Sequence, residues 1–256
     1  MDYTQLFQFA GQRVMVIGAG SGIGREAALA LDAHGAHVIC ADRDVETAQE
    51  TADMLSSGST VIELDVLDIQ SVQAASNEFN DIAALVFTAA TNVRKRIVDY
   101  TMEEFDRVVN LNLRASFGLI QAFAPRLAAN GGGSIIGISS IRASVVEPGQ
   151  SVYAATKAAL VQLARTAAAE FGPQGVRVNV VAPGVVETPL TAQIKANPGW
   201  YNAYAQKSAL GRWARPEEMA GAIVYLASPA SSFVTGSVLT VDGGWTAIDG
   251  RFTPPN

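Results

Sequence analysis

A strand, a glycine-rich loop and a helix follow one another near the start of the chain, and this order limits the possible folds strongly. Residues 13–18 form a short apolar stretch typical of a buried strand, and they lead directly into the loop Gly18-Ala-Gly-Ser-Gly-Ile-Gly24. Residues 25–34 are rich in helix formers and end before Gly35. Glycines in such a loop let a pyrophosphate approach the backbone at the N-terminus of the helix. The segment therefore predicts a nucleotide site; the alternative is a glycine-rich connection without a ligand.

Asp42 follows the second predicted strand, residues 37–41, about 20 residues past the glycine loop. An acidic side chain at this distance is expected to bind the hydroxyl groups of an adenosine ribose. It also repels a 2′-phosphate and so favours NAD over NADP; Ser21 agrees, because no basic residue lies inside the loop. Arg43 argues for NADP, unless its side chain lies flat on the adenine. We predict NAD as the cofactor.

Strands and helices continue to alternate through the rest of the chain. The further predicted strands are mostly apolar and cover residues 60–64, 82–90, 134–139, 176–181 and 238–244. The further predicted helices cover residues 44–56, 69–80, 102–129, 153–171 and 216–227. Apolar strands separated by helices are typical of a parallel sheet that is covered on both faces. We therefore expect a single α/β domain over residues 1–256, without a linker or an internal repeat.

The composition argues against several classes of protein. Apolar residues make up 49% of the chain and charged residues 16%, which suits a large core and argues against disorder. The net charge is −6 and the longest basic tract is Arg94-Lys95-Arg96, so no nucleic-acid partner is expected. No run approaches 18 apolar residues and the N-terminus lacks a signal pattern. We therefore expect a cytoplasmic protein without a membrane partner.

Cys40, His34 and His37 are the residues that most readily raise the question of redox or metal chemistry. Cys40 is the sole cysteine, so no internal disulfide is possible, and its apolar neighbours indicate a small buried side chain. The two histidines have no cysteine or carboxylate at ligand spacing around them, so no metal site is predicted.

Tyr153 and Lys157 are four residues apart in a predicted helix, so they share one face of it. A tyrosine normally titrates near 10, and lowering its pKa to about 7 takes roughly 4 kcal/mol of differential stabilisation. An adjacent ammonium favours the phenolate, which makes the phenol useful as a proton donor and acceptor. Ser140 ends the preceding predicted strand and supplies a hydroxyl for the substrate oxygen. Taken alone, a Tyr-x-x-x-Lys pair is more often two solvated side chains.

Residues 191–213 interrupt the alternation with aromatic and proline residues, including Trp200. We interpret this segment, near 190–213, as a helical lid over a substrate pocket; the alternative is a packed excursion of the chain. The residues expected to line the pocket are Ser140, Tyr153, Arg94, Arg142, Gln150 and Trp200. Their polar and cationic character suggests a hydroxylated, even acidic substrate such as a sugar, polyol or sugar acid. The alternative for residues 94–96 is a solvated surface turn.

Together these residues resemble the short-chain dehydrogenase/reductase family, and the resemblance covers almost the whole chain. Its elements occur in the family's order: Gly18-x-x-x-Gly22-x-Gly24, Asp65-Val66, Asn112, Ser140, Tyr153-x-x-x-Lys157, Pro183-Gly184 and Asp242-Gly-Gly. The thirteen residues from Ser140 to Tyr153 are the family's usual interval. The resemblance implies a Rossmann-type fold, with a doubly wound, seven-stranded parallel sheet and helices on both faces.

The resemblance also implies a role for each candidate residue. Tyr153 would be the general acid/base for the alcohol or carbonyl oxygen, and Lys157 would lower its pKa and hold the nicotinamide ribose. Ser140 would orient the substrate oxygen, and Asn112 would position a water that joins Lys157 to solvent. The remaining residues implied to bind NAD are Gly18, Ser21, Gly22, Ile23, Gly24, Asp42, Arg43, Asp65, Val66, Thr88, Ala89, Ala90, Pro183, Gly184, Val186 and Thr188.

The resemblance leaves the substrate open between two enzyme activities. Members acting on sugars and polyols are similar to this chain, and 3-oxoacyl reductases are nearly as similar but usually prefer NADP. A third interpretation, from a different class, is a sensor or assembly protein that binds NAD without turnover. Family members are usually homotetramers, which is the expected assembly here, and residues 252–255 are a candidate contact with a neighbouring subunit.

Two positions depart from the family pattern. The chain has Ile17 before the first glycine, where a threonine is usual, and Phe87-Thr88-Ala89-Ala90 where Asn-Asn-Ala-Gly is usual. In the family that threonine helps tie the first strand to the fourth. We expect apolar packing of Ile17 near Phe87 to replace this polar tie, since replacing both partners of a buried polar contact is often nearly neutral.

Overall fold

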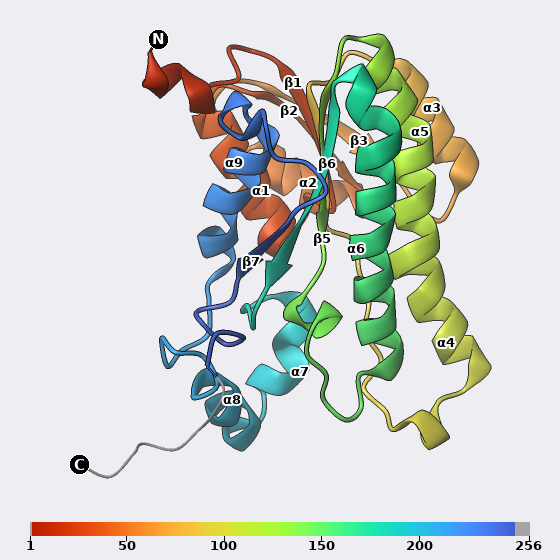
Figure 1. Ribbon diagram of the computed structural model, residues 1–256, viewed down its shortest axis with the longest axis vertical. Coiled ribbons are helices and arrows are strands. Elements are labelled where there is room, and N and C mark those ends of the chain that lie inside the picture. Colours follow the sequence, from red (N-terminus) through yellow and green to blue (C-terminus); the bar gives the residue numbers. More distant parts are fainter. Residues whose placement is uncertain (1, 249–256) are drawn as a thin grey trace.

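The computed structural model describes residues 2–248 and contains one sheet of seven parallel strands (Figure 1). The strands are β1 (Arg13–Ile17), β2 (His37–Asp42), β3 (Ser59–Glu63), β4 (Ala84–Phe87), β5 (Gly133–Ile138), β6 (Val176–Pro183) and β7 (Val238–Val241). Their order across the sheet is β3-β2-β1-β4-β5-β6-β7, so the direction of winding reverses between β1 and β4. This is the order of a doubly wound, Rossmann-type sheet, and it confirms the predicted fold class.

Helices cover both faces of this sheet, as Figure 1 shows. The α-helices are α1 (Gly22–Ala33), α2 (Val45–Ala52), α3 (Ile69–Glu78), α4 (Met102–Val109), α5 (Ala115–Ala129), α6 (Ser151–Phe171), α7 (Ala192–Lys195), α8 (Pro198–Ala205) and α9 (Ala220–Ala227). Short 3₁₀ segments lie at Tyr3–Phe7, Ile97–Asp99, Ile141–Ala143, Gly172–Gln174, Pro189–Thr191, Pro216–Met219 and Pro229–Ser231. Helices α3, α5 and α6 pack on one face, and α1, α2 and α9 pack on the other.

The strands are apolar because the side chains of each one alternate between two buried faces. In β1, Met15 and Ile17 belong to the core under α3, α5 and α6, whereas Val14 and Val16 belong to the core under α1, α2 and α9. Cys40 lies in the second core and is fully buried, as expected, and burial raises the pKa of its thiol to about 11. Because both faces of each strand carry apolar side chains, the sheet is buried between two layers of helices.

The predicted helix over residues 102–129 is interrupted by a π-helical turn. Helix α4 begins with a capping box, in which the Thr101 hydroxyl accepts from the Glu104 N–H and the Glu104 carboxylate accepts from the Thr101 N–H. The chain then forms the π-helix Asn110–Arg114 before α5. Inserted turns of this kind occur often at functional sites.

Two predicted strands are shorter in the structure. β4 ends at Phe87 rather than residue 90, and the chain beyond it is held by the side chain of Asn112, which hydrogen-bonds the backbone N–H and carbonyl of Thr91. β7 ends at Val241 rather than residue 244, because Gly243 and Gly244 turn the chain at φ of 61° and 78°. A side-chain contact or a glycine turn thus follows the end of each of these strands.

The expected replacement of a polar tie between β1 and β4 is only partly right. Ile17 and Phe87 are paired in register and both lie in the same core, so the apolar contact is present. A hydroxyl tie is present too, because Thr88 donates to the carbonyl oxygens of Ile17 and Gly18. The tie comes from the β4 side instead of the β1 side.

The segment after β6 forms α7 and α8 beyond the carboxyl ends of β6 and β7 (Figure 1). Its aromatic side chains pack on one another, with Trp213 stacked on Tyr201 at 4.9 Å between ring centroids and on Tyr204 at 5.9 Å. Within residues 2–248, none of the helices is long and apolar enough to span a membrane. The predicted intersubunit contact at residues 252–255 lies outside the described residues.

Candidate active site

The loops that carry the predicted site residues all follow the carboxyl ends of strands. Because the seven strands are parallel, these ends meet at one edge of the sheet. The glycine loop follows β1, Thr88 follows β4, Ser140 follows β5, and the segment from Gly184 follows β6. The structure therefore brings residues from distant parts of the chain to one edge, near the reversal between β1 and β4.

The glycine loop has a backbone conformation that residues with a side chain could not adopt, as is usual in phosphate-binding loops. Gly18 and Gly22 have φ of 85° and 52°, which favours glycine. A Cβ on Gly24 would lie 1.9 Å from the carbonyl oxygen of Gly18, so the loop closes on helix α1 too tightly for another residue. Ser21 precedes α1 and, among residues 2–248, its side chain makes no capping hydrogen bond to the helix. The first N–H groups of α1 therefore have no side-chain acceptor, which fits a dinucleotide's pyrophosphate.

Asp42 lies beside this loop at the end of β2. Its Oδ2 accepts from the backbone N–H of Gly20 at 3.0 Å, and its Oδ1 accepts from that of Asp44 at 3.1 Å. Arg43 is exposed. Arg25, in the first turns of α1, donates to the Gly20 carbonyl at 2.6 Å and to Glu50 at 3.0 Å, so its guanidinium is already occupied.

The other residues expected to bind the cofactor lie around the same edge. Thr188 is next to the glycine loop, since a Cβ on Gly22 would lie 3.3 Å from its Cγ2. Val186 is buried and pairs with Ala214. Pro183 ends β6, and Gly184 lies so close to Asp242 that a Cβ would meet its Cα at 2.8 Å.

The remaining expected cofactor residues follow the same strand ends or lie on α1, and all except the exposed Asp65 are buried or half-buried. Ile23 packs from α1 onto the core, and Val66 is 9% exposed. The Asp65 carboxylate accepts from the Leu67 N–H at 2.9 Å. Ala89 and Ala90 are half-buried after Thr88.

Tyr153 and Lys157 lie one turn apart on α6, and both are buried. The Nζ of Lys157 lies 5.6 Å from the centroid of the Tyr153 ring and donates to the Ile138 carbonyl at 2.7 Å. Ser140 precedes a 3₁₀ turn, and its Oγ accepts from the Arg142 N–H at 3.1 Å. The spacing in sequence thus places the phenol, the amine and the serine hydroxyl at one buried point.

The pKa of Tyr153 is shifted in the direction opposite to the one expected. Burial raises the pKa of Tyr153, and the opposing contributions come from a hydrogen bond with Ser140 and the charges of Arg94 and Arg142. Burial also lowers the pKa of Lys157 to about 8. Both shifts have the same origin, because removing a group from water disfavours its charged form. The phenol is therefore neutral at pH 7 in this structure.

Asn112 lies in the π-helical turn and is 1% exposed. Its Oδ1 accepts from the Thr91 N–H at 2.8 Å, and its Nδ2 donates to the Thr91 carbonyl at 2.9 Å and to the Thr156 hydroxyl at 3.2 Å. Asn112 thus fastens the chain after β4 to helix α6, within one turn of Tyr153. Ser139 fastens the same helix to β5 by donating to the Lys157 carbonyl at 2.9 Å.

Three of the four expected substrate residues outside the catalytic group, Arg94, Arg142 and Gln150, meet at a residue that sequence reasoning missed, Glu147. Its carboxylate accepts from Arg142 and from Gln150, the latter at 2.6 Å, and lies 3.7 Å from Nη1 of Arg94. Arg94 in turn lies over the ring of Trp200 at 5.6 Å. The expectation of a solvated turn is wrong for Arg94, whose side chain is 14% exposed.

Three further residues around this cluster were also missed. Tyr204 donates to Glu147, Trp245 lies under the guanidinium of Arg142 at 5.3 Å, and Asn92 donates to Gln150 at 3.0 Å. A carboxylate in the interval between Ser140 and Tyr153 was the one available signal for Glu147. Tyr204 lies in the aromatic segment that was predicted to form a lid, whereas Asn92 and Trp245 carried no such signal.

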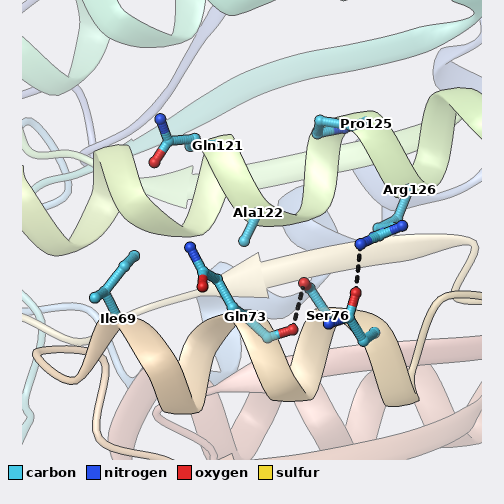
Figure 2. Close-up of a pocket in the computed structure, with 8 residues that line it drawn as sticks. Ile69, Gln73, Ser76, Gln121, Ala122, Pro125 and Arg126 are labelled. Carbon is cyan, nitrogen blue, oxygen red and sulfur yellow. Dashed lines mark hydrogen bonds between the residues drawn. The ribbon is translucent and has the colours of Figure 1, made fainter.

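A surface groove lies between α3 and α5, well away from these residues (Figure 2). It is lined by Ile69, Gln73, Ser76, Asn77, Gln121, Ala122, Pro125 and Arg126. In it Ser76 donates to the Gln73 carbonyl at 2.9 Å, and Arg126 donates to Asn77. The contact between Arg126 and Asn77 joins the two helices, and the residues that line the groove include none of the predicted site residues.

Comparison with known proteins supports one family throughout. The family model described as Enoyl-(Acyl carrier protein) reductase matches residues 18–246. The chain is 36% identical to galactitol 2-dehydrogenase (L-tagatose-forming) of Cereibacter sphaeroides, over 96% of this chain and 99% of the relative. It is 32% identical to gluconate 5-dehydrogenase of Gluconobacter oxydans over 96% and 99%, and 33% identical to the 3-oxoacyl-[acyl-carrier-protein] reductase of Thermotoga maritima over 91% and 97%.

A solved structure agrees with these relatives. A gluconate 5-dehydrogenase from Burkholderia cenocepacia, in complex with NADP and tartrate, is similar with a TM-score of 0.90 and 31% identity. The match covers 96% of this chain and 99% of that chain. The similarity therefore extends over the sheet, its helices and the segment after β6.

Proposed function

The chain belongs to the short-chain dehydrogenase/reductase family, and on that premise we propose that it interconverts a secondary alcohol and a ketone with NAD, on a sugar, polyol or sugar acid. The observation that carries this proposal is the convergence of Tyr153, Lys157 and Ser140 at the edge that holds the glycine loop. Two similar relatives are named for a polyol and a sugar acid.

The chain's own residues supply binding, placement and proton transfer. A bound nicotinamide cofactor supplies or accepts the hydride. The α1 N-terminus and Gly22 would hold its phosphates, Asp42 its adenosine ribose, and Val186 and Thr188 its carboxamide. Tyr153 exchanges the proton with the substrate oxygen, and Ser140 orients that oxygen.

The neutral phenol of Tyr153 is suited to donate a proton, which is the step required to reduce a ketone. In the oxidation direction the hydroxyl must accept a proton, so it must first lose its own. Positive charge near the ring favours that loss, and Arg94 and Arg142 already act in this direction. Lys157 holds the ribose and, when protonated, adds to that positive charge.

NAD is proposed because the carboxylate of Asp42 lies at the loop where a 2′-phosphate would approach. The similar gluconate 5-dehydrogenase structure holds NADP, so NADP is the competing assignment. Arg25 does not favour it, because Gly20, Glu50 and Thr51 already engage its guanidinium.

A 3-oxoacyl reductase activity is the second candidate, and the Thermotoga maritima relative favours it. The pocket argues against an acyl chain, because Arg94, Arg142 and Glu147 place three charged groups next to Tyr153. A non-catalytic NAD-binding protein is the third candidate, and it gives no reason for burying an amine beside a phenol.

We also propose that α7 and α8 form a lid over the substrate and that the assembly is a homotetramer in the cytoplasm. The lid assignment is supported by Trp200 and Tyr204, which reach from α8 into the charged cluster of Arg94 and Glu147. The tetramer and the location follow from the family alone.

The test is a screen of the purified protein against sugars, polyols and hydroxy acids, with NADH and NADPH formation followed separately. We expect oxidation of a hydroxylated compound of this class with NAD as the better acceptor. Saturable NAD binding with no turnover of any compound, in either direction, would instead support the non-catalytic candidate.

A further inference from the structure

Two guanidinium groups and one carboxylate are buried together beside the proposed catalytic tyrosine. Arg142 has a direct partner: its Nη2 donates to Oε2 of Glu147, and its guanidinium lies over the Trp245 ring at 5.3 Å. Its side chain is 7% exposed, and that of Glu147 is 18% exposed. Arg142 and Glu147 thus form a closed ion pair of zero net charge.

Arg94 is the second guanidinium, and its charge is not paired in the same way. Its Nη1 lies 3.7 Å from Oε1 of Glu147, which is too long for a hydrogen bond. That oxygen already accepts from Gln150 at 2.6 Å and from the hydroxyl of Tyr204. Among residues 2–248, the buried Nη1 atom has no hydrogen-bond partner. Trp200 offers its ring to the cation but no acceptor atom.

Asn92, two residues before Arg94, carries a buried acceptor atom that also lacks a partner within residues 2–248. This atom is Oδ1, whereas Nδ2 of the same side chain donates to Gln150 at 3.0 Å. Buried polar atoms are normally paired, and those without a partner call for a ligand or an ordered water. An anion would pair with Nη1 of Arg94 and a hydroxyl group with Oδ1 of Asn92, and a hydroxy acid supplies both groups.

Resting on the proposed function, we propose that the substrate is a hydroxycarboxylate or its keto form, that Nη1 of Arg94 binds its carboxylate, and that Oδ1 of Asn92 accepts from one of its hydroxyl groups. The cationic guanidinium of Arg94 favours an anionic substrate over a neutral one, because its buried Nη1 has no hydrogen-bond partner within residues 2–248. The subsite lies next to the reacting oxygen, since the charges of both arginines reach the Tyr153 hydroxyl.

The test compares acids with polyols of the same carbon skeleton in the intact protein: D-gluconate with D-glucitol, and D-galactonate with galactitol. In the wild type we expect kcat/KM for the better acid to exceed that for its polyol by at least about 10-fold, the value of one charge-assisted hydrogen bond. A polyol that is oxidised faster than either acid would overturn the assignment, and this outcome needs no variant.

The variants separate the subsite from a structural role of Arg94. Arg94→Gln should raise KM for the acid about 10- to 100-fold more than KM for the polyol, while kcat falls for both compounds because the charge of Arg94 also favours proton loss from Tyr153. Arg94→Lys should recover part of the acid's affinity, because it keeps the charge. The matched control is Arg96→Gln, an exposed arginine on the same loop, which should leave the ratio of acid to polyol unchanged. An equal rise in KM for the acid and for the polyol in Arg94→Gln would contradict the proposal.

If NAD binds but none of the four compounds is turned over, the proposed function fails. The anion subsite is then tested separately, by measuring whether the acids bind. Trp200 lies under the guanidinium of Arg94, so tryptophan fluorescence reports on it. Saturable quenching by gluconate or galactonate that is lost in Arg94→Gln, but kept in Arg96→Gln, supports an anion subsite. No saturable quenching by either acid overturns it.

Discussion

The hydroxyl of Thr88 lies 3.2 Å from the carbonyl oxygen of Ile17 and 3.3 Å from that of Gly18. It joins the end of β4 to the start of the glycine loop, at the point where the sheet reverses its winding. Thr88 also limits the space at Gly18, where a Cβ would lie 2.3 Å from the threonine Oγ1. One side chain therefore helps to hold the loop in the shape that the cofactor requires.

Replacing Thr88 by valine should lower the free energy of unfolding by about 1–2 kcal/mol, since it removes the hydroxyl and keeps the shape of the side chain. Urea unfolding measures this change. Thr240→Val is the matched control, because Thr240 is exposed on β7, and its effect should stay within about 0.5 kcal/mol. Equal stability of the Thr88 and Thr240 variants would show that the tie contributes nothing measurable.

Replacing Ile17 by threonine should also destabilise the protein, although it restores the residue usual in the family. Ile17 is 1% exposed and packs in the apolar core with Phe87, so the new hydroxyl group is buried among apolar side chains. We expect a loss of about 1–3 kcal/mol. A clear rise in the melting temperature would contradict this account of the β1–β4 contact.

Tyr153→Phe should reduce kcat/KM by at least about 100-fold, because the ring and its packing remain but the proton donor is gone. Binding of NAD, followed by fluorescence titration, should change by less than about 3-fold in terms of Kd. The control is Tyr3→Phe, which removes a hydroxyl from a residue that is 71% exposed. Undiminished turnover would remove Tyr153 from the mechanism.

Lys157→Met should change the way in which stability depends on pH. Burial lowers the Lys157 pKa from 10.5 to about 8, which corresponds to about 3 kcal/mol. Between these pH values the unfolded chain binds more protons than the folded one, so stability rises with pH. Below about pH 8 the lysine is charged in both states and the full cost is present.

We therefore compare the free energies of unfolding of Lys157→Met and the wild type. The difference should favour the variant most near pH 7. The relative stability of the variant should fall by up to about 3 kcal/mol as pH rises toward 10.5, whatever constant loss follows from the Ile138 hydrogen bond. Urea unfolding at pH 7, 8.5 and 10 measures the difference. A difference that does not vary with pH would contradict the lowered pKa.

Asp42→Asn should shift the cofactor preference toward NADP. The amide oxygen still accepts from the Gly20 N–H, while the negative charge that repels a 2′-phosphate is gone. We expect the ratio of kcat/KM for NADP to that for NAD to rise on the order of 10-fold. Asp53→Asn at the end of α2 is the control, and it should leave the ratio unchanged.

The sheet and the paired chemistry on α6 were predictable because each depends on local patterns. Short stretches of sequence are enough to recognise the apolar strands β1 and β6 and the loop with glycines at 18, 22 and 24. The interval of four between Tyr153 and Lys157 becomes a shared face as soon as α6 forms. The position of Asp42 likewise follows from the length of one strand–helix–strand unit.

The charged cluster and the direction of the Tyr153 pKa were decided by the tertiary structure alone. Glu147 meets Arg94 and Tyr204 only after the segments that carry them fold to one end of the sheet, and no periodicity records such a meeting. Likewise, spacing predicts a neighbouring amine for Tyr153. The direction of its pKa shift, however, is set by burial, which depends on all the residues packed around the ring. Sequence thus determined which candidate groups share one helix face, and packing determined how far water is kept from them.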